Sequence, residues 1–114
     1  MNQEQILIKA KEICWDLRKN LHPEREDGEI KLMEEHEHWV SANKDSLPTI
    51  FLENWRWVRE TLEDSVRKDK QAHNTPDGPD KKLILDEVRK LRYCCWNVLK
   101  ETGSEIQQEL DSLN

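Results

Sequence analysis

The chain has 114 residues, of which 37% are charged and 35% hydrophobic, so it has room for one small domain and not for a second core. Its formal net charge of -6 argues against direct nucleic-acid binding, which depends on a cationic surface, and its apolar stretches fall far short of the ~20 residues of a membrane span. Three glycines and four prolines are too few for a many-turned β fold, whereas good helix formers abound, so the composition predicts an all-α protein.

Two amphipathic helices are predicted in the first part of the chain. Apolar side chains recur every three or four residues over 3–21, and this helix should end near Asn20–His22 because Pro23 cannot continue it. An acidic connection is expected over 24–29. A second, shorter helix should then run over about 29–43.

Two longer helices are predicted in the rest of the chain. The most regular apolar spacing of the sequence predicts a third helix over 51–71, and the Asn, Pro, Asp and Gly residues of 73–79 predict a loop after it. A fourth helix is expected over 80–101. Gly103 should break this helix, and Ser104 is placed to cap a short fifth helix at the C-terminal end.

Four amphipathic helices joined by short connections predict an up-down four-helix bundle that comprises residues 1–114 as a single domain. Two helical hairpins that dimerise into a larger bundle are the alternative. The three cysteines, Cys14, Cys94 and Cys95, are odd in number and lack the spacing of a disulfide framework or a metal site. Together with an N-terminus that lacks a signal-peptide layout, they favour a cytoplasmic, reducing location.

Five tryptophans in a chain with one Phe and one Tyr are the most unusual feature of the composition. Trp55 lies on the apolar stripe of the third helix, which predicts a core position. Trp15, Trp57 and Trp96 lie beside their stripes or off them. They are either half-buried covers of the bundle or anchors for a partner, because tryptophan is enriched at binding hot spots. We take these three as candidate partner-binding residues.

The second predicted helix carries a dense run of acidic and histidine residues around Glu34, Glu35 and Glu37. Glu35 and His38 have the Glu-x-x-His spacing of di-metal bundles, but no second motif of that kind occurs in the chain. A solvated acidic face is the simpler interpretation. Such a face would suit a protein partner with a basic surface, and we add the three glutamates to the candidate partner-binding residues.

Two pairs of carboxylates have Glu-x-x-Glu spacing, Glu34 with Glu37 and Glu60 with Glu63. This layout, over residues 30–66, resembles the all-α nucleotide pyrophosphohydrolases of the MazG type, in which acidic pairs on successive helices coordinate magnesium. The resemblance implies that the four carboxylates converge to hold Mg²⁺, which prefers oxygen ligands and bridges substrate phosphates.

Arginines recur one turn apart on the third and fourth predicted helices, at Arg56 and Arg59 and again at Arg89 and Arg92. If the two helices are antiparallel neighbours, these side chains could face a common anion such as a nucleotide phosphate. The simpler interpretation pairs them with glutamates and aspartates at helical spacing on their own helices.

The leading hypothesis from the sequence is a non-catalytic, acidic helical module that binds a protein partner with a basic surface. An adaptor, an assembly subunit and an inhibitor, phage-borne inhibitors included, would all fit this description. No cofactor, no nucleic acid and no membrane are expected, and a homodimer is an open outcome because exposed tryptophans favour self-association. The alternative is a phosphate-ligand protein, either a Mg-dependent pyrophosphohydrolase or a nucleotide binder.

Overall fold

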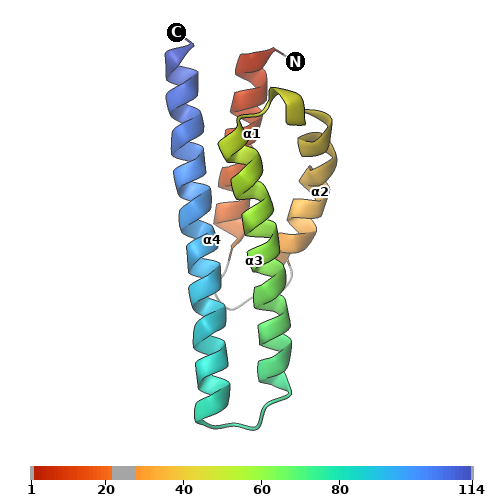
Figure 1. Cartoon of the computed structure of the whole chain (residues 1–114), viewed down its shortest axis with the longest axis vertical. Helices are drawn as coiled ribbons and strands as arrows, with labels where there is room; N and C mark the ends of the chain where they lie inside the picture. The colour runs from red at the N-terminus through yellow and green to blue at the C-terminus, as the bar shows by residue number, and fades with distance from the viewer. Residues whose placement is uncertain (1, 22–27, 114) are drawn as a thin grey trace.

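A computed structural model of the chain describes residues 2–21 and 28–113, and these form an all-α fold, as predicted. The main helices are α1 (Gln3–Asn20), α2 (Gly28–Ala42), α3 (Thr49–His73) and α4 (Pro79–Ser112), and a short 3-10 helix, η1 (Lys44–Ser46), precedes α3. Successive helices alternate in direction, so that α4 runs antiparallel to both α1 and α3 (Figure 1). This is the up-down order that the sequence predicts.

The ends of α1 follow from local chemistry. The Asn2 side chain accepts a hydrogen bond from the backbone N–H of Gln5 at 2.8 Å, and the Gln5 side chain accepts one from the backbone N–H of Asn2 at 3.0 Å. This reciprocal capping satisfies two N–H groups that the first turn would leave unpaired. The helix ends at Asn20, as predicted, whereas most of the expected acidic connection lies outside the described residues.

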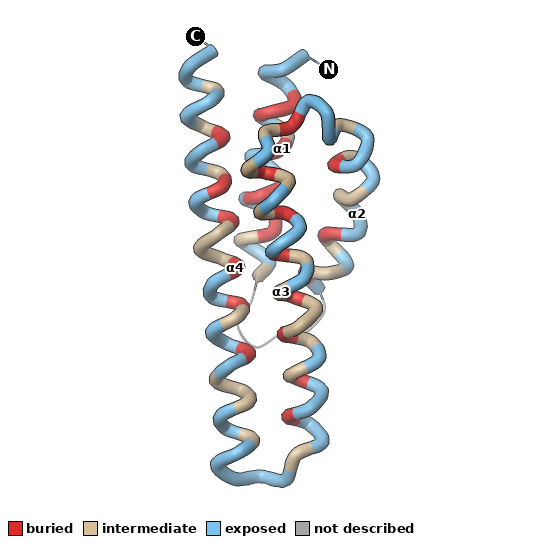
Figure 2. Tube along the Cα trace, in the orientation of Figure 1, coloured by how far each residue is buried: buried red, intermediate tan, exposed pale blue. Residues whose placement is uncertain are grey.

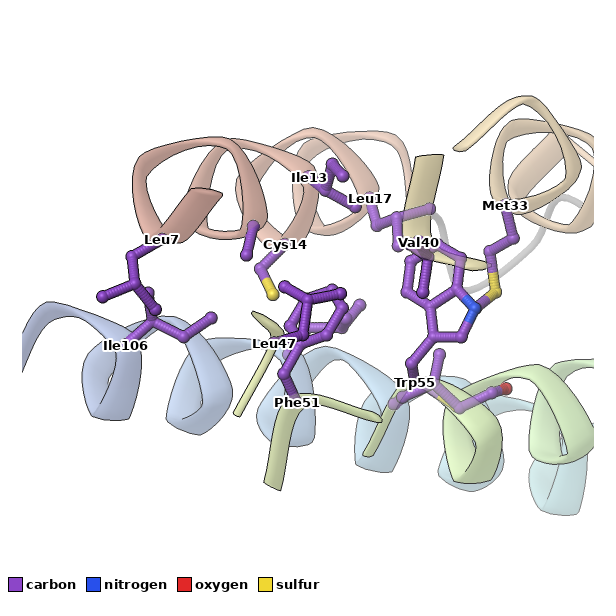
Figure 3. Close-up of a cluster of buried hydrophobic side chains, with 14 of the residues drawn as sticks. Leu7, Ile13, Cys14, Leu17, Met33, Val40, Leu47, Phe51, Trp55 and Ile106 are labelled. Atoms are coloured by element: carbon purple, nitrogen blue, oxygen red, sulfur yellow. The ribbon is translucent and has the colours of Figure 1, made fainter. Parts of the chain in front are cut away.

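The hydrophobic core lies between α1, α3 and α4, with α2 adding side chains from one side. Figure 2 shows the buried positions of these helices facing one another. Phe51 and Trp55 point from α3 into this core, where Trp55 lies among side chains that include Met33 and Val40 of α2 (Figure 3). Trp55 is only 6% exposed, in agreement with its predicted core position.

The bundle is complete at one end of the molecule only. The described residues extend over 56 × 23 × 20 Å, and the α3–α4 hairpin continues well past the end of α1 and the start of α2 (Figure 1). In this extension α3 buries the small or polar residues Ser65, Asp69 and Ala72, while α4 buries Val88. The core to which all four helices contribute therefore ends about halfway along α3 and α4. Beyond that point the molecule is a hairpin of these two helices.

The predicted break at Gly103, and with it the short fifth helix, is wrong. α4 continues without interruption to Ser112, and the Ser104 hydroxyl donates back to the Lys100 carbonyl oxygen at 3.2 Å instead of capping a new helix. Gly103 lies against α1, with Cys14 the nearest side chain to the position of a β-carbon, at 3.9 Å. Packing on α1 holds this stretch helical against the low propensity of a single glycine.

Despite their length, none of the helices in the described residues has an apolar window that could cross a membrane.

Candidate functional site

An aromatic and basic cluster covers the line where α1 meets α4. The guanidinium carbon of Arg18 lies 5.2 Å from the ring centroid of Trp15 and 4.7 Å from that of Trp96, so the cation contacts both indoles. Tyr93 stacks beside Trp96 with ring centroids 6.4 Å apart, and the Lys100 ammonium lies 5.6 Å from the Trp96 centroid. The contact of Arg18 with Trp96 ties α1 to α4 at the surface, whereas the other contacts lie within one helix.

Three hollows of about 340, 320 and 320 Å³ follow this line. The 340 Å³ hollow and the 320 Å³ hollow next to Tyr93 lie beside the cluster. The other 320 Å³ hollow shares Lys11, Trp15 and Gln107 with the 340 Å³ hollow. We call the surface that they form the α1/α4 groove. It is defined by Ile8, Lys11, Trp15, Arg18, Leu21, Tyr93, Trp96, Lys100, Gln107 and Leu110.

The groove exposes large apolar side chains. Trp15 is 58% exposed and Tyr93 is 65% exposed, and Ile8 extends the apolar surface along α1. Cys14 and Leu99, both buried, form the floor of the 340 Å³ hollow. The site therefore combines exposed aromatic rings with buried apolar side chains beneath them.

The charge of the groove is opposite to that of the whole chain. Lys11, Arg18 and Lys100 line the 340 Å³ hollow, and among residues 2–21 and 28–113 no Asp or Glu lines that hollow or the one beside Tyr93. The chain as a whole has 24 acidic against 18 basic residues. Among the described residues, one carboxylate, that of Glu12, lines the groove, in the hollow that it shares with Lys11 and Trp15. The centre of the groove is a basic strip on an acidic protein.

The sequence places these side chains together through two helical stripes. On α1, Ile8, Lys11, Trp15 and Arg18 follow one another at intervals of three and four, next to the core stripe. On α4, Tyr93, Trp96 and Lys100 do the same. Sequence analysis named Trp15 and Trp96 and missed Arg18, Tyr93 and Lys100. The spacing of aromatic and basic residues beside each core stripe was the available signal.

The third candidate tryptophan lies elsewhere. Trp57 is 41% exposed on α3 and lines none of the hollows of the α1/α4 groove. The structure therefore groups two of the three candidate tryptophans and leaves the third apart from them.

The acidic residues of α2 form a different surface. The Trp55 indole N–H donates to the Glu37 carboxylate at 2.7 Å, so Glu37 is the hydrogen-bond partner of a core side chain. Glu34 pairs with Arg59 at 3.4 Å. Glu35 is an exposed residue of α2 and lines a hollow beside the first turns of that helix. None of these three glutamates lines the α1/α4 groove, so the predicted acidic and aromatic contacts belong to separate faces.

The four candidate magnesium ligands do not converge. Glu60 pairs with Arg56 at 3.1 Å and Glu63 with Arg59 at 2.9 Å, while Glu34 and Glu37 have the partners given above. Within residues 2–21 and 28–113, no group of three or more His, Cys, Asp and Glu side chains is arranged to hold a metal ion. The convergence that the MazG resemblance implies is not seen, because each carboxylate faces a cation or an indole of the neighbouring turn or helix.

The four candidate phosphate-binding arginines are also dispersed. Arg56 and Arg59 form the ion pairs at helical spacing that were the simpler expectation. Arg89 pairs with Asp86 on the exposed side of α4, whereas Arg92 is 2% exposed and pairs with the buried carboxylate of Glu29. Side chains three residues apart point in directions about 60° apart around a helix, which is enough to expose one arginine and bury the other.

The thiols of Cys14 and Cys95 are buried, which makes them unreactive at neutral pH. Burial raises the pKa of Cys14 to about 12, although the charge of Arg18 opposes the shift. Burial and the neighbouring Cys94 raise the pKa of Cys95 to about 12 against the opposing charge of Arg92. Both thiols therefore stay protonated at neutral pH and behave as small apolar side chains, one of them in the floor of the groove.

Comparisons with protein-family models, with curated proteins and with solved structures gave no match for this chain.

Proposed function

We propose that this chain is a non-catalytic protein-interaction module that docks its partner in the α1/α4 groove. The observation that carries the proposal is the cluster of Trp15, Arg18, Tyr93 and Trp96 over a hollowed surface, in which the rings of Trp15 and Tyr93 are exposed. Trp, Tyr and Arg are the residue types that contribute most of the binding energy at protein interfaces.

The rigidity of the cluster supports the same proposal. Trp15 and Trp96 are linked through the guanidinium of Arg18, and Trp96 is stacked against Tyr93. Side chains that are already ordered lose less conformational entropy on binding, so they contribute more of their contact energy to affinity. Adaptors, assembly subunits and inhibitors all use such a surface. Docking of a basic partner on the acidic face of α2 and a reducing, intracellular setting stay predictions from the sequence.

Affinity capture with matched variants tests the proposal. The bait proteins are the unaltered chain, the double variant Trp15→Ala/Trp96→Ala, and Trp57→Ala as a control that removes an exposed tryptophan outside the groove. Thermal melting followed by circular dichroism first establishes that all three are folded. We expect proteins retained from a lysate of the source cells by the unaltered chain and by Trp57→Ala to be lost with the groove variant.

Two outcomes contradict the proposal. One is the same set of captured proteins on all three baits, which would place the docking surface outside the groove. The other is no specific capture by the unaltered chain, which would remove the reason for treating the groove as an interaction surface.

A further inference from the structure

We propose that the occupant of the α1/α4 groove is an amphipathic helix of another protein, with acidic residues beside its apolar stripe. This inference rests on the proposed function and adds the chemistry of the partner. It comes from two properties of the groove, its charge and its shape, which are independent of each other.

The charge argument starts at Trp96. Arg18 and Lys100 both contact this one ring, at 4.7 and 5.6 Å from its centroid, and Lys11 lines the same hollow. Among the described residues, no carboxylate forms an ion pair with any of these three cations. The three cations therefore line one hollow without an ion pair to a described residue, and Lys11 instead donates a hydrogen bond to the side-chain oxygen of Gln107. A partner carboxylate beside Trp96 would be attracted by both Arg18 and Lys100, which contact that ring.

Arg18 is prepared for such a contact. Its guanidinium is held against Trp15 and Trp96, and its planar N–H donors match the geometry of a carboxylate. Because the indoles fix the cation in advance, little side-chain entropy is lost when the ion pair forms. Acidic residues of the partner are thus favoured at the centre of the groove, and basic ones are repelled there.

The shape argument concerns the two antiparallel helices that wall the groove. From Ile8 to Leu21, α1 offers a wall of about 20 Å at 1.5 Å per residue, which matches three to four turns of a helix. A helix can pack in the groove between two neighbouring helices where the residues at the contact are small or flat. The floor of the α1/α4 groove is formed by Cys14, Leu99 and Gly103. A helix with apolar residues at i, i+4 and i+7 would pack them along this floor and against the exposed ring of Trp15, beside the Arg18 guanidinium that lies between Trp15 and Trp96.

A displayed peptide library provides the test. Each peptide has about 18 residues with a fixed apolar stripe, and its flanking positions carry Glu or Lys at random, so that charge is the only variable. After selection on the immobilised chain, we expect Glu to exceed Lys at least about fivefold at the flanking positions. The affinity of the best peptide should fall at least about tenfold in Lys11→Glu/Lys100→Glu, which is about 1.4 kcal/mol.

A charge-matched control separates the groove from the net charge of the chain. Lys31→Glu/Lys70→Glu makes the same change of four charge units on exposed positions of α2 and α3, and we expect it to change the affinity less than about twofold. An equal loss in both double variants would mean that general charge, and not the basic strip, selects the peptide, which overturns the inference.

The remaining outcomes distinguish this inference from the proposed function. Enrichment of Lys, with binding still lost in Trp15→Ala, overturns the acidic partner and leaves docking in the groove intact. Enriched peptides that bind Trp15→Ala as well as the unaltered chain overturn both. Selection without any enriched peptide overturns the helical partner. A dimer in sedimentation equilibrium that Trp15→Ala dissociates makes a second copy of this chain the occupant, which also overturns it.

Discussion

The buried ion pair between Glu29 and Arg92 is predicted to be the most sensitive polar contact of the fold. Both side chains are 2% exposed, and they join the first turn of α2 to the middle of α4. Arg92→Met removes the cation and leaves the Glu29 carboxylate buried without its partner, which typically costs about 3–5 kcal/mol. At about 4 °C per kcal/mol for a chain of this length, the melting temperature should fall by about 12–20 °C.

A double-mutant cycle isolates the pair from the packing around it. Glu29→Leu alone should be similarly costly, whereas Glu29→Leu/Arg92→Met replaces both charges by apolar groups and should recover to within about 1 kcal/mol of the unaltered chain. Arg89→Met, one turn away and exposed, should cost less than about 1 kcal/mol. Urea denaturation of the five proteins measures all of these values. A loss below about 1 kcal/mol in both single variants, or strictly additive losses in the double variant, would refute the reasoning.

Four further predictions concern packing and burial. Trp55→Ala should cost about 3–5 kcal/mol in urea denaturation because it removes a buried ring and its indole hydrogen bond; a near-neutral result would contradict the core position. Gly103→Ala should stabilise the chain by about 1 kcal/mol, since α4 is continuous there and the added methyl group meets only ordinary contacts; a loss would indicate a break. A thiol reagent at pH 8 should label Cys94 quickly, and Cys14 and Cys95 only after unfolding. Because burial raises the pKa of these two thiols, the unfolded chain ionises first, and stability should fall as the pH rises from about 9 toward 12.

The arrangement of helices could be predicted from the spacing of apolar residues along the chain alone. The stripe through Ile6, Ile13 and Leu17 specifies the buried face of α1 without reference to any other helix. The break at Gly103 failed because a single low-propensity residue is a local signal, whereas the contact of α4 with α1 at that point is a tertiary one.

The candidate site shows the same limit. Trp15 and Trp96 were identified because each large aromatic lies off its core stripe. Their common contact with Arg18 was not, because α1 and α4 are about eighty residues apart in sequence and meet only in the folded chain. Arg92 was misplaced for a similar reason. Its spacing from Arg89 describes one helix, while its burial is decided by Glu29 on another.

The docking of a helix in the α1/α4 groove is tested most directly by the tryptophan indoles themselves. The five indole N–H groups give separate signals in a nitrogen–proton correlation spectrum, and a peptide selected on the unaltered chain can be titrated while they are recorded. We expect the signals of Trp15 and Trp96 to shift in a saturable way and that of Trp57, which lies outside the groove, to stay in place. Saturable binding that shifts Trp57 and leaves Trp15 and Trp96 unchanged would contradict the account.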